Sequence, residues 1–272
     1  MADAVTAALL RRGLGVETFL TGAAGDAAKR AQTIDDDIDR ILVVGGDGTL
    51  NEILNGLAHP SRIPIAQLPM GTANILAHEL SLPKHSEKVA ALVAAGRVRH
   101  VDMGIANGKR FLMVASCGFD AMVTRVIKQN RSGSLGYKGY LLPILRTLYH
   151  YRPPRLCVCV DHGPPTYGAF VVVGNTQNYG GIFSITDRAQ CDSNHLDVCV
   201  FPRGTRLALT WYYLAALARR VSRATDTRYL TGRHITITSD QPTAIEIDGD
   251  YFGQTPVEIT IQPAVVPILV SP

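Results

Sequence analysis

Apolar and polar residues follow two different periods along the first hundred positions. Unbroken apolar runs such as 41–44 predict strands buried on both faces, because a strand open to water on one side would alternate. Apolar residues three or four positions apart, as in 50–57, predict helices. Helices alternating with strands favour a doubly wound, mostly parallel sheet. The predicted strands are 16–20, 41–44 and 63–68, and the predicted helices are 4–12, 25–32, 49–57, 75–80 and 87–95.

The pattern changes near residue 101, where short β-type runs separated by turn residues take over. They predict an antiparallel, sandwich-like domain. We therefore expect an α/β domain over 1–101, which 262–272 would rejoin, and a β-sandwich domain over 102–261. Helical insertions are predicted at 119–129, 138–149 and 207–220. The strand runs are 111–115, 156–160, 170–173, 196–200, 234–238, 244–247 and 257–261.

Composition and charge exclude several classes of protein. The 272 residues carry a formal net charge of +4, too small a basic excess for a nucleic-acid-binding surface. The five cysteines include no CxxC pair, which favours a reducing, cytoplasmic environment. The first ten residues do not have the pattern of a signal peptide, and no apolar run reaches the ~20 residues of a membrane span. We expect a cytoplasmic protein without a nucleic-acid partner.

The first glycine turn, residues 45–49, carries the clearest chemical signal. It links a buried strand to a helix, so free N–H groups and the positive end of the helix dipole would face an anion. Its glycines allow a ligand to approach the backbone closely. Thr49 is predicted as the N-cap, and Glu52 would complete a capping box. Asp47 would repel phosphates unless it holds a metal or orients a catalytic group.

A second glycine turn, residues 70–74, follows the next predicted strand. Two such turns on neighbouring strands, each with a hydroxyl (Thr49 and Thr72), would form a two-sided phosphate cradle. Alone, the first turn is also typical of a tight strand-to-helix connection. Asp248 and Gly249 alone are typical of a hairpin turn. The combination of segments is more specific than any one of them.

The chain resembles the diacylglycerol-kinase-type lipid kinases, the family that includes bacterial lipid kinases and sphingosine and ceramide kinases. The likeness covers about nine-tenths of the chain, and its segments stand in the family's order. The matching segments are Thr21 to Ala27, GGDGTLNEILNG at 45–56, PMGTAN at 69–74, Asn175 with Tyr179-Gly180-Gly181, 189–197, and Ile247-Asp248-Gly249-Asp250.

This resemblance implies a Rossmann-like nucleotide-binding domain, a β-sandwich domain and an active site in the cleft between them. The implied reaction moves the γ-phosphoryl group of ATP, with Mg²⁺, to the hydroxyl of a lipid such as diacylglycerol. Asp248 would be the catalytic base, and Asp47 would act in a magnesium–water network. Asp192 would bind a metal in the β domain. The implied nucleotide-binding residues are Thr21, Gly45, Gly46, Asp47, Gly48, Thr49, Gly71, Thr72 and Asn74.

Three departures from the family pattern stand out. The family opens with a strand and an Asn-Pro-x-x-Gly loop, which this sequence lacks, so we expect the first strand to be missing or the start site to be misassigned. Ile75 stands where many members have Asp, and Glu79, one helical turn further on, would supply the metal-binding carboxylate instead. Ser193 and Asn194 replace an Asp-Gly pair, and Asn tolerates the left-handed conformation.

Two other functions stay open. The chain could be an NAD kinase-like phosphotransferase, since those enzymes share the GGDGT loop, or a degenerate non-catalytic protein that binds lipid or nucleotide. Partners are equally open beyond a lipid at a membrane surface: the apolar segment 207–220 fits either a helix packed on the sheet or a peripheral contact with the inner face of the membrane. The sequence does not decide whether the chain forms a homodimer.

Overall fold

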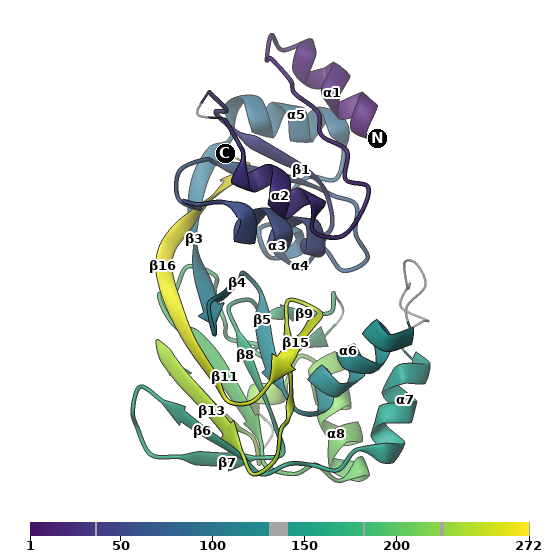
Figure 1. The fold of residues 1–272 in the computed structure, drawn as a ribbon, viewed down its shortest axis with the longest axis vertical. Coiled ribbons are helices and arrows are strands. Elements are labelled where there is room, and N and C mark those ends of the chain that lie inside the picture. The colour runs from purple at the N-terminus through teal and green to yellow at the C-terminus, as the bar shows by residue number, and fades with distance from the viewer. Residues whose placement is uncertain (36, 131–140, 182, 224–225, 272) are drawn as a thin grey trace.

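The computed structural model describes the chain except residues 36, 131–140, 182, 224–225 and 272, and consists of two halves stacked along its long axis (Figure 1). The upper half is the α/β half and the lower one is the β half. The elements of the α/β half are α1 (Ala2–Leu10), α2 (Asp26–Gln32), β1 (Ile41–Gly45), α3 (Asp47–Gly56), β2 (Ile65–Pro69), α4 (Ile75–Glu79) and α5 (Ser86–Ala95).

Helices cover both faces of the parallel pair β1 and β2, as the doubly wound prediction requires. Val43 and Ile65 point to the face covered by α3, where they pack with Leu50. Ala66 and Leu68 point to the opposite face, which α1 and α5 cover. Burial on both sides explains the apolar run of β2, whereas β1 lies at the edge of the sheet and leaves Val44 37% exposed.

The strand predicted at 16–20 is wrong. This segment is extended, but it pairs with no strand of the described chain. Phe19 is 51% exposed and Leu20 is 80% exposed, so these two apolar side chains are not part of the core. An apolar run becomes a strand only where a neighbouring backbone edge accepts its hydrogen bonds.

The β half is an antiparallel sandwich, as predicted. One sheet has the order β12-β11-β8-β5-β14-β15, and the facing layer is formed by β7, β6, β13, β16, β3 and β4. Its elements are β3 (Arg97–Ala106), β4 (Lys109–Phe111), β5 (Val114–Cys117), α6 (Phe119–Asn130), α7 (Leu141–His150), β6 (Leu156–Val160), β7 (Thr166–Gly168), β8 (Phe170–Gly174), β9 (Asn178–Tyr179), β10 (Phe183–Ser184), β11 (Leu196–Phe201), α8 (Arg206–Leu217), η2 (Val221–Arg223), β12 (Arg228–Gly232), β13 (His234–Ser239), β14 (Ala244–Ile247), β15 (Asp250–Gln254) and β16 (Val257–Val270).

Alternation along β8 shows how the layers form. Val171 and Val173 face the core between the two sheets, whereas Phe170 and Val172 face the layer of α6, α7 and α8. The three predicted helical insertions are thus present as one layer, although residues 138–140 of the second insertion lie outside the described residues.

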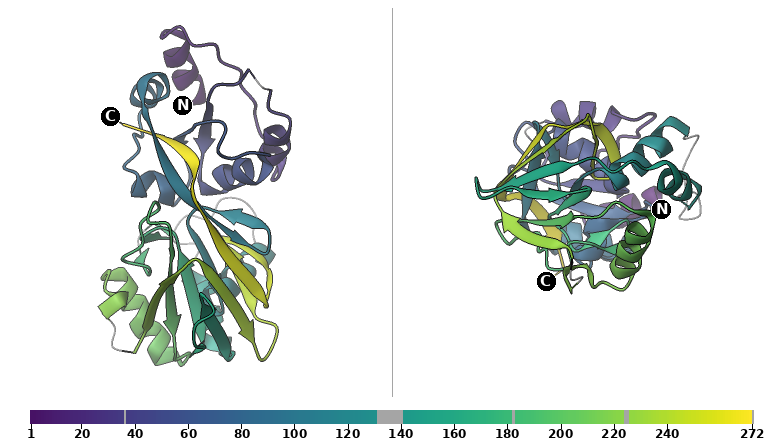
Figure 2. Two further views of the ribbon diagram at one scale, coloured as in Figure 1. Left: turned by 90° about the vertical axis from the view of Figure 1, so that its left-hand side faces the viewer. Right: turned by 90° about the horizontal axis from the view of Figure 1, so that it is seen from below.

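Two long strands join the halves. β3 and β16 run antiparallel from the sandwich into the α/β half, where Ile268 of β16 pairs with Ile65 of β2 (Figures 1 and 2). The predicted division at residue 101 falls inside β3. One apolar cluster also continues from Leu50 through Met103 to Phe119, so the halves share part of their core.

Candidate active site

The two predicted glycine turns are in direct contact. A Cβ atom on Gly46 would lie 2.8 Å from Gly71 Cα, and one on Gly71 would lie 2.6 Å from Gly46 Cα. The N–H of Met70 donates to the carbonyl of Gly45 at 3.1 Å. Parallel neighbouring strands bring both turns to one edge of the sheet, and only residues without a side chain permit this approach.

Asn74 shapes the second turn. Its Oδ1 accepts the N–H of Gly71 at 2.8 Å, and its Nδ2 donates to the Gly71 carbonyl at 2.8 Å. Its backbone is left-handed, with φ of 47°. Both polar atoms of the Asn74 side chain are thus engaged by the loop itself, which favours a shaping role over direct contact with a nucleotide.

Asp47 joins the first turn to the helix that follows the second. Its Oδ2 accepts the N–H of Ile75 at 3.1 Å, so this carboxylate binds the N-terminus of α4. Its Oδ1 is buried and has no hydrogen-bond partner among the described residues. Burial raises the pKa of Asp47, although backbone N–H groups of α4 oppose the shift.

Thr49 is not the helix cap that the sequence predicts. α3 begins at Asp47 with Gly46 as its N-cap, so Thr49 lies inside the first turn of the helix. Glu52 does not close a capping box either, because its Oε1 accepts the N–H of Gly25 at 2.8 Å. Glu52 therefore ties α3 to the start of α2.

Four of the predicted nucleotide residues lie on the surface: three belong to the two turns, and Thr21 belongs to the segment before α2. Thr21, Gly48, Gly71 and Thr72 are exposed. No atom of the described chain lies within 4 Å of a Cβ placed on Gly48, and its φ is not left-handed. Neither packing nor backbone geometry requires glycine at position 48. A ligand that lies close to the backbone at this position would require it.

The other predicted metal ligands already have partners. Glu79 Oε2 accepts Nδ2 of Asn178 at 3.0 Å, and burial raises the pKa of Glu79. Asp192 Oδ2 accepts two hydrogen bonds from Arg99, from Nη2 at 2.7 Å and Nε at 3.0 Å. The charge of Glu79 also helps to raise the pKa of Arg99. Arg99 therefore offsets the negative charge of Asp192 and Glu79, where the sequence predicts a metal ion.

The described residues contain no group of three or more His, Cys, Asp or Glu side chains arranged to hold a metal. Mg²⁺ in phosphate-transfer sites needs only one or two carboxylates, because phosphates and water complete its shell. The unpartnered Oδ1 of Asp47, beside the contacting glycine turns, fits that smaller requirement.

Asp248 lies on the hairpin between β14 and β15 and is held by four donors. Its Oδ1 accepts the N–H groups of Met113 and Val114 at 3.0 and 2.9 Å. Its Oδ2 accepts the N–H of Leu112 at 3.0 Å and Nδ2 of Asn51 at 2.8 Å. Burial raises the pKa of Asp248 to about 6, against the lowering effect of these hydrogen bonds.

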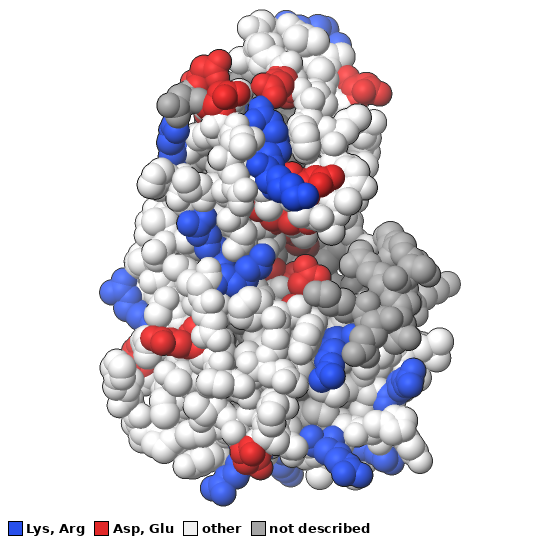
Figure 3. Space-filling view, viewed as in Figure 1, with Lys and Arg blue, Asp and Glu red and all other residues white. Residues whose placement is uncertain are grey.

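Asn51 is a site residue that sequence reasoning missed. It stands one helical turn after Asp47 on α3, and its amide reaches Asp248 across the junction of the two halves. Nearby, Asn55 and Arg110 exchange hydrogen bonds through the Arg110 backbone, which fixes α3 against β4. Aspartate or glutamate residues are visible at the surface of this junction in the space-filling view (Figure 3). The sequence signal for Asn51 was its place in the segment 45–56, which resembles the family.

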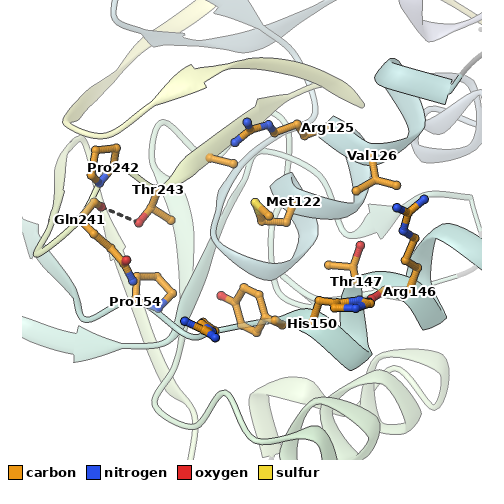
Figure 4. Close-up of a pocket in the computed structure, with 13 residues that line it drawn as sticks. Met122, Arg125, Val126, Arg146, Thr147, His150, Pro154, Gln241, Pro242 and Thr243 are labelled. Atoms are coloured by element: carbon orange, nitrogen blue, oxygen red, sulfur yellow. Dashed lines mark hydrogen bonds between the residues drawn. The ribbon is translucent and has the colours of Figure 1, made fainter.

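A pocket of about 470 Å³ lies elsewhere, between α6, α7 and the segment before β14. Met122 and Val126 of α6 lie opposite Thr147 and His150 of α7 (Figure 4). None of the predicted site residues lines it. The pocket is therefore separate from the glycine turns and Asp248.

Comparison with known proteins agrees with the fold. A model of the diacylglycerol kinase catalytic domain matches residues 1–106, and one of the YegS C-terminal NAD kinase beta sandwich-like domain matches residues 113–270. The chain is 27% identical to diacylglycerol kinase of Staphylococcus carnosus over 254 residues, 90% of this chain and 81% of the relative. Diacylglycerol kinase of Bacillus subtilis is also 27% identical, over 90% of this chain and 82% of the relative.

Solved structures give the same assignment. A diacylglycerol kinase from Bacillus anthracis has a TM-score of 0.79 at 27% identity, over 100% of this chain and 92% of that one. An NAD kinase from Archaeoglobus fulgidus, with a TM-score of 0.53, 13% identity and coverage of 98% of this chain and 88% of that one, shares the fold alone. This chain belongs to the diacylglycerol kinase catalytic-domain family and is a lipid kinase.

Proposed function

We propose that the chain transfers the γ-phosphoryl group of ATP to the hydroxyl of diacylglycerol or a closely related lipid. The observation that carries the proposal is the position of Asp248. This carboxylate is bonded to α3, the helix that begins at the two contacting glycine turns, and its pKa of about 6 suits a base at neutral pH. A phosphate cradle and a proton acceptor on opposite sides of one junction are what phosphoryl transfer to an alcohol requires.

The glycine turns would hold the nucleotide phosphates. The backbone N–H groups at the start of α3 point out of the helix, and its dipole favours an anion there. Gly48 leaves open space at this end, so a phosphate group can approach the backbone. Asp47 would stay outside the first contacts with the phosphates, because its Oδ2 is bonded to α4.

The acceptor alcohol would reach Asp248 by replacing Asn51. A carboxylate has about four lone-pair positions, and the four donors to Asp248 occupy them. Three of these donors are backbone N–H groups, whereas the amide of Asn51 can move by side-chain rotation. The lipid hydroxyl then donates to Oδ2, Asp248 takes its proton, and the alcohol oxygen attacks the γ-phosphorus as the bond to the β-phosphate oxygen breaks.

Mg²⁺ would be held by Asp47 Oδ1 together with the nucleotide phosphates, and when bound it would offset phosphate charge. Glu79 and Asp192 could join a metal site only by giving up Asn178 and Arg99, so their metal roles stay predictions.

We further propose that α7 and α8 bring the enzyme to an anionic membrane. α7 exposes Leu142, Leu145 and Tyr149, and α8 exposes Leu207, Trp211, Leu214 and Leu217. The helices are in contact, since the Arg206 guanidinium lies 4.5 Å from the ring centroid of Tyr149. Neither helix contains Asp or Glu, and the exposed arginines 146, 206, 219 and 220 lie within these helices or just after α8. Such a basic, aromatic and apolar face fits a layer of anionic headgroups.

No helix of the described residues is long and apolar enough to cross a bilayer. Surface contact through α7 and α8 would therefore be the way in which this part of the chain reaches a lipid substrate.

The test is phosphoryl transfer from labelled ATP, with Mg²⁺, to a panel of acceptors: diacylglycerol, a sphingoid base, ceramide, phosphatidylglycerol, a polyprenol and NAD. We expect labelled phosphatidic acid as the main product. Labelled NADP would favour the NAD kinase alternative. ATP binding in calorimetry without any labelled product would favour a non-catalytic protein.

A further inference from the structure

Four polar side chains meet inside the β half, next to the turn that carries Asp248, and the proposed reaction does not use them. Ser116 and Glu246 are 2% and 1% exposed. Water does not reach these two side chains, so their polar atoms must form hydrogen bonds within the protein. The four come from β5, α6, β9 and β14, and are Ser116, Asp120, Tyr179 and Glu246.

The number of hydrogens in this cluster fixes its protonation. The hydroxyl oxygen of Ser116 lies 2.9 Å from Asp120 Oδ2 and 2.8 Å from Glu246 Oε2. A hydroxyl has one hydrogen, so Ser116 can donate to only one of these oxygens. If both carboxyl groups were ionised, Ser116 Oγ would also lie beside a carboxylate oxygen to which it donates no hydrogen. Such an unpaired contact is unfavourable in a site shielded from water. One of the two carboxyl groups must therefore carry a proton.

Glu246 is the better holder of that proton. The hydroxyl of Tyr179 also donates to Asp120 Oδ2, so two hydroxyl groups converge on Asp120 and favour its charged form. A charge on Glu246 would face Asp248, two residues further on. Hydrogen bonds then run in one direction, from Glu246 Oε2 to Ser116 Oγ and from Ser116 Oγ to Asp120 Oδ2. Burial raises the pKa of Glu246 well above its ordinary value and that of Asp120 to about 6, in the same order.

The second oxygen of Glu246 holds the turn that carries Asp248. Glu246 Oε1 accepts the N–H of Gly249. Asp248 and Gly249 are both left-handed, with φ of 47° and 87°. This conformation is unfavourable for a residue with a side chain, so the turn needs support from its surroundings. The hydrogen bond from the Gly249 N–H to Glu246 Oε1 spans Asp248 and provides this support.

We propose that Glu246 is a positioning residue for Asp248 and that it acts as a neutral carboxylic acid. The inference rests on the proposed role of Asp248 as the base. In its neutral form Glu246 fixes the Gly249 N–H and donates to Ser116 without placing a second negative charge beside Asp248 or the transferred phosphoryl group. Ionisation of Glu246 at alkaline pH breaks the hydrogen bond to Ser116 and loosens the turn.

The surroundings of Glu246 favour its neutral form. Among the side chains that the structure describes, the titratable groups around the cluster are acidic or phenolic, and an arginine lies over one of the phenol rings. These groups are Asp120 of α6, Tyr179 of β9, Asp248 of the turn, Tyr213 of α8, which faces Asp120, and Tyr251 of β15, with Arg125 5.7 Å from its ring centroid.

Two variants separate a neutral from a charged Glu246. In Glu246→Gln the amide oxygen can accept the Gly249 N–H and the amide nitrogen can donate to Ser116, as the protonated acid does. Glu246→Ala removes both contacts. Glu258→Gln, which removes a carboxylate with a 64% exposed side chain from β16, is the matched control. The readouts are kcat and KM for ATP and diacylglycerol against pH, unfolding midpoints, and the infrared carboxylic-acid band at neutral pH in D₂O.

We expect Glu246→Ala to lower kcat about tenfold or more, with KM for ATP little changed, because a small displacement of the base suffices for such a loss. Glu246→Gln should recover most of that loss, keep the unfolding midpoint and remove the alkaline decline in kcat that we expect of the wild type. The carboxylic-acid band should be present in the wild type and in Glu258→Gln, and absent in Glu246→Gln.

A Glu246→Gln variant as damaged as Glu246→Ala would overturn the proposal, because a charged carboxylate would then be required. So would the same carboxylic-acid band in the wild type and in Glu246→Gln. If no lipid is phosphorylated by the wild type, the proposed function fails, but the infrared and unfolding measurements still decide whether Glu246 is neutral.

Discussion

Asn51 Nδ2 lies 2.8 Å from Asp248 Oδ2, and this hydrogen bond connects the glycine-turn helix of one half to the candidate base of the other. The two residues are 197 positions apart in sequence. Asn51 also donates to the carbonyl of Arg110 at 3.2 Å, so its amide is anchored on the β half at two points. In the absence of substrate, the bond holds the Asp248 carboxylate against α3, the helix that begins at the first glycine turn.

Asn51→Ala should shift the acidic limb of the kcat/KM profile to higher pH. The amide stabilises the charged form of Asp248, so its loss raises the pKa of that carboxyl above about 6. The shift should amount to several tenths of a pH unit or more. Asn107→Ala is a matched control, since Asn107 also bonds across a loop, to Pro256 and Glu258, away from the site. If the acidic limb of the kcat/KM profile does not move in Asn51→Ala, a group other than Asp248 determines it.

Alanine at the glycine turns should distinguish packing from ligand contact. Gly46→Ala and Gly71→Ala place a Cβ under 3 Å from the opposite backbone, so both should lower the free energy of unfolding, by about 1–3 kcal/mol. Gly48→Ala meets no atom of the described chain and should leave stability equal or higher. ATP affinity, measured by calorimetry, should nevertheless fall in Gly48→Ala; unchanged affinity would place the phosphates elsewhere.

Stability should fall as pH rises from about 4 to 6. Asp120 and Asp248 have folded pKa values raised to about 6 from 3.8, so the folded state holds protons that the unfolded chain has released. The stabilisation is present below the unfolded pKa and is lost as pH passes the folded pKa. In urea titrations, Asp248→Asn should show a smaller decrease across this interval than the wild type. Equal decreases would show that Asp248 has no raised pKa.

Trp211 gives a direct test of membrane contact, because it is the only tryptophan of the chain and is 60% exposed on α8. Its emission should move to shorter wavelength with phosphatidylglycerol vesicles but not with phosphatidylcholine vesicles. Leu214→Glu should weaken vesicle binding without changing turnover of a soluble short-chain diacylglycerol. Leu20→Glu is the control, since Leu20 is exposed on the α/β half. Equal losses in both variants would argue against the α7–α8 face.

Local patterns predicted the fold well because the buried strands and helices have distinct periods. They failed at 16–20, where Phe19 and Leu20 are apolar but no strand of the described chain pairs with them. They also misplaced the start of α3, because its N-cap is Gly46, three residues before the predicted cap Thr49. Apolar and capping residues show that a segment is able to form a strand or to begin a helix. Whether it does so depends on the strands and loops that lie beside it in the folded chain.

The candidate site divides in the same way. The contact of Gly46 with Gly71 could be expected, since consecutive parallel strands end at one edge. The partners of Asp248 could not be expected, because Asn51 and the N–H groups near Val114 reach it only through the folded chain. The cluster around Glu246 was invisible for the same reason.

The most direct test of the central claim is turnover by Asp248→Asn with labelled ATP and diacylglycerol in mixed micelles, alongside ATP affinity and unfolding of the same preparation. The wild type should form labelled phosphatidic acid. The variant, folded and binding ATP as the wild type does, should lose about 10²–10⁴-fold in kcat, the range for removal of a general base. A folded variant with wild-type turnover, or a wild type that phosphorylates no lipid, would contradict the account.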